Sequence, residues 1–204
     1  MAEDRVVLVG VDGSPESLGA VDWAVARAAR ENWRVHILCA YSLPSFTTAS
    51  LDGGYAALDD SAIRSGAQAV VSEAADRAQG KGVTVTNSLE TGDPAGVLVD
   101  LSDEAALTVV GTRGGGGFTD RLLGTVSSAL PAHAHCPTIV VPRHTEGADY
   151  TPVRRIVVGV DGSDSARKAL RWAVREADVW DAELTAIAAV PMASGAGALA
   201  WLPA

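Results

Sequence analysis

An internal repeat constrains the fold of this chain more than any other feature of its sequence. The stretch RVVLVGVDGSPESLGAVDWAV, residues 5–25, returns without a gap as RRIVVGVDGSDSARKALRWAV, residues 154–174. The alignment of the two copies places Asp12 opposite Asp161. A spacing of about 150 residues is too long for a solenoid repeat and is typical of a duplicated domain. The chain is therefore predicted to contain two related modules in tandem.

The length of the chain makes the second module incomplete. The 204 residues allow one full domain with part of another. The polar stretch HTEGADYTPV, residues 144–153, has the composition of a linker. We therefore predict a complete domain over residues 1–143 and a partial second domain over residues 154–204. The partial domain stops just after its second apolar run.

Apolar runs alternate with segments of helical period in the first module. The run VVLVGV is short, β-branched and uninterrupted, as in a strand that is buried on both faces. It ends at DGSP, where Ser14 is placed to cap a helix and Pro15 to take its first position. The other predicted strands are RVHILCAY, VTVTNSL, ALTVVG and PTIVVP. Helical segments between them predict an α/β fold, a doubly wound, Rossmann-like five-stranded parallel sheet.

The composition limits what such a fold can bind and where it works. A net charge of −9 and a pI near 4.8 argue against a nucleic-acid partner, which needs a clustered basic face. The two cysteines, Cys39 and Cys136, are too few for a disulfide framework, and MAEDRVVLVG does not resemble a leader. The uncharged segment after Glu183 is interrupted by proline and glycine, so no membrane anchor is predicted. These features predict a cytoplasmic protein.

The most unusual stretch is GTRGGGGFTDRLLGTVSS, residues 111–128. It begins where the fourth predicted strand ends and finishes where a helix begins, near Thr125. Bare backbone lets a ligand approach closely, and the amides at a helix N-terminus favour anions. This placement favours a phosphate site over a flexible surface loop. The P-loop pattern GxxxxGK[ST] and the dinucleotide pattern GxGxxG are both absent.

The spacing of Gly111, Gly114, Gly124 and Thr125 is Gly, two residues, Gly, nine residues, Gly, then a hydroxyl residue. This spacing resembles the ATP-binding motif of the universal stress protein family. The resemblance extends to the opening VVLVGVDGSP, the closing SSALPAHAHCPTIVVP and the tandem arrangement. It implies an adenine nucleotide alpha-hydrolase-like fold that binds ATP with Mg²⁺. The family's role is regulation under stress, including growth arrest.

The resemblance also implies roles for individual residues. Gly10 and Asp12 would border the adenosine and Mg²⁺ region, with Asp12 as the residue nearest the metal. Ala40 would meet adenine through its backbone. The ribose and phosphate contacts would come from Gly111, Arg113, Gly114, Gly115, Gly116, Gly117, Gly124, Thr125, Val126 and Ser127.

Structural interpretations compete with these functional ones. Asp12 is placed to help cap the helix after DGSP, as Asp does at many helix starts. The alternative interpretation of Arg113 and Arg121 is that they are solvated surface charges. The sequence HAHC suggests a metal cluster, but His133 and His135 are two residues apart and would point in different directions on a helix. No metal site is predicted there.

Three functions compete: an ATP-binding regulator, a slow ATP hydrolase or phosphotransferase, and a nucleotide-free dimerisation module. The intact glycine motif favours the regulator over the dimerisation module. Apart from Asp120, the glycine stretch has no group that could activate water, so slow turnover is the most that we expect. We predict one ATP per chain, bound within residues 1–143. Residues 154–204 are expected either to pair with another copy of the chain, which gives a homo-oligomer, specifically a dimer, or to remain poorly ordered.

Overall fold

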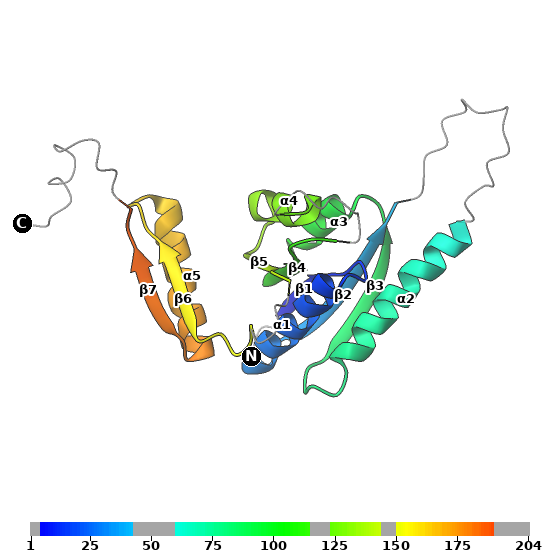
Figure 1. The fold of residues 1–204 in the computed structure, drawn as a ribbon, viewed down its shortest axis with the longest axis horizontal. Coiled ribbons are helices and arrows are strands. Elements are labelled where there is room, and N and C mark those ends of the chain that lie inside the picture. The colour runs from blue at the N-terminus through cyan, green and yellow to red at the C-terminus, as the bar shows by residue number, and fades with distance from the viewer. Residues whose placement is uncertain (1–4, 43–59, 115–122, 144–149, 190–204) are drawn as a thin grey trace, which may run out of the picture. The chain divides into compact units, whose positions relative to one another are not determined.

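The computed structural model describes residues 5–42, 60–114, 123–143 and 150–189 (Figure 1). The chain divides into two compact units, residues 1–150 and residues 151–204. None of the helices in these described ranges is long and apolar enough to cross a membrane. Each unit is described by itself below.

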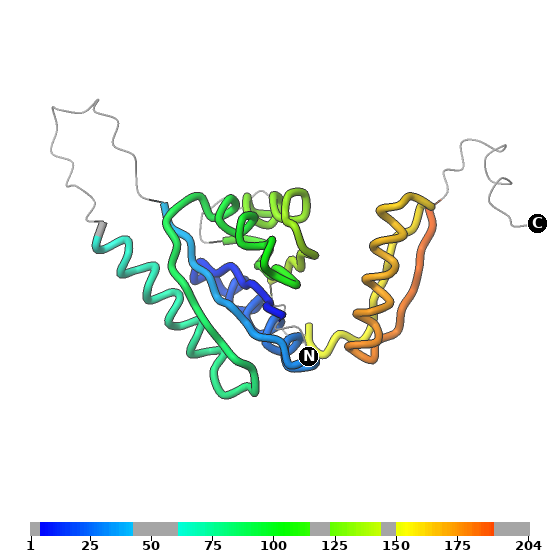
Figure 2. Tube along the Cα trace, turned by 180° about the vertical axis from the view of Figure 1, so that it is seen from behind, coloured from blue at the N-terminus to red at the C-terminus, as the bar shows by residue number. Residues whose placement is uncertain are grey.

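The first unit contains a five-stranded sheet in which all neighbouring strands run parallel (Figures 1 and 2). Its strands are β1 (Val6–Gly10), β2 (Arg34–Tyr41), β3 (Val85–Thr91), β4 (Leu107–Gly111) and β5 (Thr138–Val141). They lie in the order β3-β2-β1-β4-β5. The predicted five-stranded parallel sheet is thus confirmed. The strand order reverses between β1 and β4, and ligand crevices form at such a position in open parallel sheets.

Two pairs of helices cover the sheet. The helices are α1 (Pro15–Glu31), α2 (Asp60–Ala78), α3 (Pro94–Leu101) and α4 (Thr125–His133). Helix α1 packs against α2, and α3 packs against α4, so the two pairs form the layers on either face. This is the doubly wound arrangement that alternating strands and helices predict.

The turn from β1 into α1 has the predicted cap. Ser14 is the N-cap of α1, and its Oγ accepts a hydrogen bond from the backbone N–H of Ser17 at 3.2 Å. Pro15 takes the first helical position, where a missing N–H costs nothing. The helix ends at Asn32, which adopts the left-handed conformation with φ of 56°. The cap starts α1 directly beyond the carboxyl end of β1.

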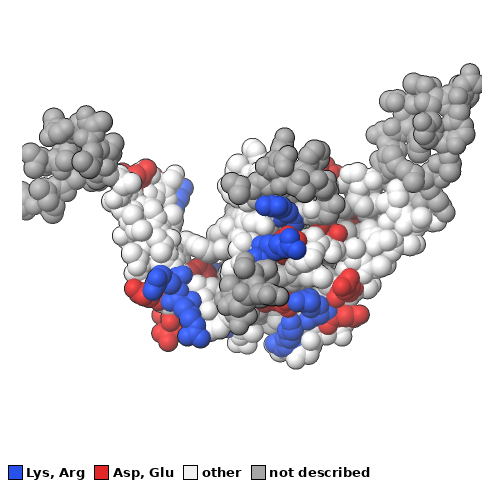
Figure 3. All heavy atoms as spheres, viewed as in Figure 1, with Lys and Arg blue, Asp and Glu red and all other residues white. Residues whose placement is uncertain are grey.

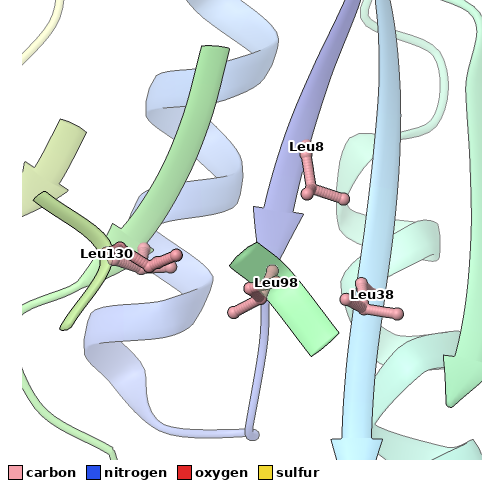
Figure 4. Close-up of a cluster of buried hydrophobic side chains, with 5 residues drawn as sticks. Leu8, Leu38, Leu98 and Leu130 are labelled. Carbon is pink, nitrogen blue, oxygen red and sulfur yellow. The ribbon is translucent and has the colours of Figure 1, made fainter. Parts of the chain in front are cut away.

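A leucine-rich cluster holds α3 and α4 against the sheet (Figure 4). Its members come from β1, β2, α3, β4 and α4, and each is at most 3% exposed: Leu8, Leu38, Leu98, Val110 and Leu130. Gly10 permits this packing, because a Cβ there would lie 2.8 Å from Cδ1 of Leu98. The cluster lies just beneath the carboxyl ends of β1 and β4.

The described part of the second unit, residues 151–189, repeats the first three elements of the first unit. They are β6 (Arg155–Gly159), α5 (Asp164–Trp180) and β7 (Glu183–Ile187), with β6 and β7 paired in parallel. Ser163 caps α5 through a hydrogen bond from the N–H of Ala166 at 3.1 Å, as Ser14 caps α1. Gly159 pairs with Ile187 as Gly10 pairs with Leu38 in the first unit.

The second unit exposes apolar side chains that have buried counterparts in the first. Val157 is 56% exposed and Ile187 is 52% exposed. By the repeat, they stand where the first unit has Leu8 and Leu38, which belong to the buried leucine-rich cluster. The described part of the second unit has no helix equivalent to α3 and no strand equivalent to β4, so nothing in it covers these positions.

Candidate functional site

A cavity of about 430 Å³ opens at the carboxyl ends of β1 and β4, where the strand order reverses. That volume is in the range of small-molecule sites. The cavity brings together the following predicted site residues: Gly10, Asp12, Ala40, Gly111, Arg113, Gly114, Gly124, Thr125, Val126 and Ser127. The predicted Gly115, Gly116 and Gly117 lie outside the described residues, as do Asp120 and Arg121.

Sequence reasoning missed part of the cavity lining. Glu16 and Ser17, in the first turn of α1, also line the cavity, as do the apolar residues Leu38, Pro94 and Leu98. For Glu16 and Ser17 a signal was available in the sequence: they directly follow the DGSP turn, and this position places them at the carboxyl edge of the sheet. The apolar residues give one side of the cavity a hydrophobic surface.

Asp12 has a structural contact inside the site. Its Oδ1 accepts hydrogen bonds from the backbone N–H of Ser14 at 3.0 Å and from Ser14 Oγ at 2.6 Å. Ser14 Oγ also lies 3.3 Å from the carbonyl oxygen of Arg113. Asp12 therefore supports the cap of α1, as its structural interpretation holds, while it also lines the cavity. The same contacts connect the loop after β1 with the loop after β4.

Two glycines let backbone segments meet around the cavity. A Cβ on Gly114 would overlap Oδ2 of Asp12, so the loop after β4 can lie against this carboxylate only without a side chain. A Cβ on Gly111 would lie 2.7 Å from the backbone carbon of Glu16. Gly111 therefore allows the first turn of α1 to pack against the end of β4.

The N-terminus of α4 forms one end of the cavity. The carbonyl oxygen of Thr112 accepts hydrogen bonds from the N–H of Gly124 and from Ser127 Oγ, both at 2.8 Å. These bonds fix the start of α4 beside the end of β4. Gly124 is the N-cap, and no side chain of the described residues caps the helix. Uncapped amides and the helix dipole together attract anions.

Among the described residues, two acidic ones, Asp12 and Glu16, and one basic one, Arg113, line the cavity. The side chain of Glu16 is only 12% exposed, and its Oε1 lies 3.9 Å from Nε of Arg143. Figure 3 shows acidic and basic side chains interspersed on the face of the molecule that it presents. The cavity therefore combines a local cradle for anions with nearby carboxylates.

Few groups in the cavity could serve acid–base or nucleophilic chemistry. Its described lining has no histidine, lysine or cysteine. Cys39 on β2 is buried, and burial together with the nearby Asp12 carboxylate raises the pKa of its thiol. A raised pKa keeps the thiol protonated and unreactive at neutral pH. His133 and His135 do not line the cavity, and the described residues contain no group of three or more metal-ligating side chains.

A match to a family profile shows which protein family the chain belongs to. The profile of the universal stress protein family matches residues 5–142 and 152–200. The chain belongs to the universal stress protein family. The resemblance found in the sequence is confirmed, and both units of this universal stress protein fall within the match.

Universal stress proteins of mycobacteria are among the curated relatives of this chain. Universal stress protein Rv2623 of Mycobacterium tuberculosis is 32% identical over 192 residues. Universal stress protein Mb2028c of Mycobacterium bovis is 33% identical over 193 residues. Each match covers 89% of this chain and 62% of the relative, so the chain spans about three-fifths of the length of these proteins.

Solved structures of other universal stress proteins share the fold. One, crystallised in complex with cAMP, is 31% identical, with a TM-score of 0.53 over 69% of this chain and 98% of the other. A universal stress protein from Archaeoglobus fulgidus is 20% identical, with a TM-score of 0.73 over 98% of this chain and 71% of the other. The second match shows the shared fold alone.

Proposed function

We propose that this universal stress protein binds an adenine nucleotide in the cavity between β1 and β4, and that ATP is its ligand. The observation that carries the proposal is the geometry of the β4–α4 connection. Gly111 and Gly114 leave backbone bare beside the uncapped N-terminus of α4. A phosphate group is the natural ligand of such a cradle. The 31% identical structure in complex with cAMP supports an adenine nucleotide in particular.

The proposal assigns each part of the cavity a role. Ala40, Leu38 and Leu98 form the less polar side, which suits an adenine ring. The backbone around Gly111 and Gly114 would lie along the ribose and the first phosphate. The first amides of α4 and the hydroxyls of Thr125 and Ser127 would hold the remaining phosphates.

Magnesium fits this arrangement through the nucleotide. Mg²⁺ prefers oxygen ligands and is commonly held by one or two carboxylates together with substrate phosphates. Asp12 supplies a carboxylate at the cavity wall, beside the loop that would carry the phosphates. When bound, the ion would neutralise phosphate charge. Asp12 would hold it from the side of β1.

The role that we propose is regulation by a bound nucleotide in a cytoplasmic stress response, including growth arrest. Slow ATP hydrolysis or phosphotransfer is the alternative, and the lack of histidine or lysine in the described lining argues for a low rate. A nucleotide-free dimerisation module is the third candidate. The uncapped N-terminus of α4 favours nucleotide binding over it.

Nucleotide content and calorimetry test the proposal directly. Acid extraction of the purified protein, followed by chromatography, would identify any nucleotide that stays bound. Titration of nucleotide-free protein with ATP and Mg²⁺ should then give saturable binding with one site per chain. No nucleotide in the extract and no heat of binding would favour the dimerisation module. Rapid Mg²⁺-dependent phosphate release that survives repurification would favour the enzyme.

A further inference from the structure

We infer that Glu16 sets how strongly the cavity prefers nucleotides with many phosphates over those with few. The inference rests on the proposed adenine-nucleotide site. Glu16 occupies the second position of α1 and lines the cavity. A carboxylate is an unexpected group in a cradle for anions, because it repels the charge that the cradle attracts.

The packing of Glu16 places it at the end of the cavity that the N-terminus of α4 forms. Its backbone lies against Gly111, where a Cβ would come within 2.9 Å of the Glu16 carbonyl oxygen. Thr112, the residue after Gly111, holds the N-terminus of α4 through its carbonyl oxygen. Glu16 and the first amides of α4 are therefore both anchored at the end of β4. The apolar side, with Pro94 and Leu98, is formed by a different helix.

The charge of Glu16 is only partly balanced by its neighbours. Its one ion pair among the described residues is with Arg143, and the 3.9 Å between Nε and Oε1 is beyond hydrogen-bond reach. The Arg143 side chain is 78% exposed, so solvent screens much of its field. The Glu16 side chain is 12% exposed and is screened much less. The Glu16 carboxylate therefore keeps a local repulsion toward anions, beside the attraction from Arg113 and the amides of α4.

This repulsion acts more strongly on a triphosphate than on a monophosphate. The amides and dipole of α4 attract every anion, while Glu16 opposes each added phosphate charge at short range. The site should consequently bind ATP less tightly, relative to AMP, than its backbone cradle alone would allow. Glu16 acts here as a specificity-determining residue. Arg143 moderates its effect.

The test measures the dissociation constants of AMP and ATP by calorimetry on the full chain. Titrations run without divalent ions at low, fixed ionic strength. Replacing the carboxylate in Glu16→Gln should raise the affinity for ATP relative to AMP by about three- to tenfold. Arg143→Gln removes the balancing charge and should move the same ratio in the opposite direction. Glu73→Gln, an equal change of charge at an exposed position of α2 outside the cavity, should leave the ratio unaltered.

Salt provides a second readout, because added salt should shrink the difference between wild type and Glu16→Gln. An unchanged ratio in Glu16→Gln, or an equal gain for AMP and ATP, would overturn the inference while leaving nucleotide binding intact. If Glu16→Gln does not fold, the Arg143→Gln result decides, and an unchanged ratio there overturns the inference as well. Wild-type protein that binds neither nucleotide would overturn the proposed function, and the inference with it.

Discussion

Single glycines decide how closely the backbone closes around the cavity. Gly114 lies against the Asp12 carboxylate, and Gly111 lies against the first turn of α1. In both places a Cβ would come too near to atoms of another segment for ordinary contact. At the scale of the residue, the shape of the cavity depends on two positions that carry no side chain, Gly111 and Gly114.

Gly114→Ala should weaken the binding of ATP by about 1 to 3 kcal/mol, because the new methyl group displaces the Asp12 carboxylate and the loop that would carry phosphate. Calorimetry on the folded variant measures this loss. The matched control is Gly19→Ala on α1, where a Cβ meets nothing within 4 Å. Equal affinities for wild type and Gly114→Ala would mean that the phosphates bind elsewhere.

The glycine spacing was enough to predict Gly111, Gly114, Gly124 and Thr125 as neighbours of one cavity, because a strand end and a helix start fix their places. It was not enough to find Glu16. The approach of α1 to the end of β4 is a tertiary contact between segments far apart in the chain, and no local pattern encodes it. The ligand roles of all these residues stay a prediction.

At the scale of the element, the two copies of the repeat form the same local structures from related sequences. Both have a strand, a serine-capped helix and a second parallel strand. The sequence predicted these elements well because buried β-branched runs and capping residues are local signals. The bounds of β3 were less accurate: the predicted VTVTNSL starts two residues before Val85. This edge strand is largely polar, so its apolar signal is weak.

Gly10→Ala and Gly159→Ala form a matched pair, since they are equivalent positions of the repeat. A Cβ at Gly10 would lie 2.8 Å from Leu98 and would push α3 off the sheet, whereas a Cβ at Gly159 meets nothing within 4 Å. Gly10→Ala should therefore destabilise the first unit by about 1 to 3 kcal/mol. Gly159→Ala should be nearly neutral for the second unit.

Hydrogen exchange followed by mass spectrometry measures each unit separately in the full chain. Faster exchange in β1, α3 and β4 is expected for Gly10→Ala only. Similar exchange in both variants and the wild type would show that α3 can shift without loss of stability, and that Gly10 does not control the packing of α3.

At the scale of the whole molecule, the two units differ in how completely their apolar faces are covered. The first unit buries Leu8 and Leu38 beneath α3 and α4. The second leaves the equivalent Val157 and Ile187 more than half exposed. Exposed apolar side chains beside an open strand edge promote association. We therefore propose that the second unit drives the association of chains, as the predicted dimer requires.

A chain of residues 1–150 should bind ATP with the affinity of the full chain and form a smaller assembly. The cavity lies wholly within the first unit, so the deletion removes no described residue of its lining. Light scattering with calorimetry tests both expectations. Val157→Ser combined with Ile187→Ser in the full chain should reduce association in the same way. A monomeric full chain, or loss of binding on deletion, would contradict the proposed division of roles.

The position of β1 between β2 and β4 also determines when each edge of this strand can pair during synthesis. β1 is made well before β4, yet it is a central strand whose Val7 pairs with Leu107 of β4. At about 5 to 20 residues per second, a ribosome takes roughly 5 to 20 s to reach β4, and one edge of β1 must wait unpaired meanwhile. Helix α1 and strand β2 are made directly after β1, so β2 is available to pair with the other edge of β1 well before β4 is made. The described part of the second unit has the same three elements, in which β6 and β7 pair in parallel and no strand equivalent to β4 follows.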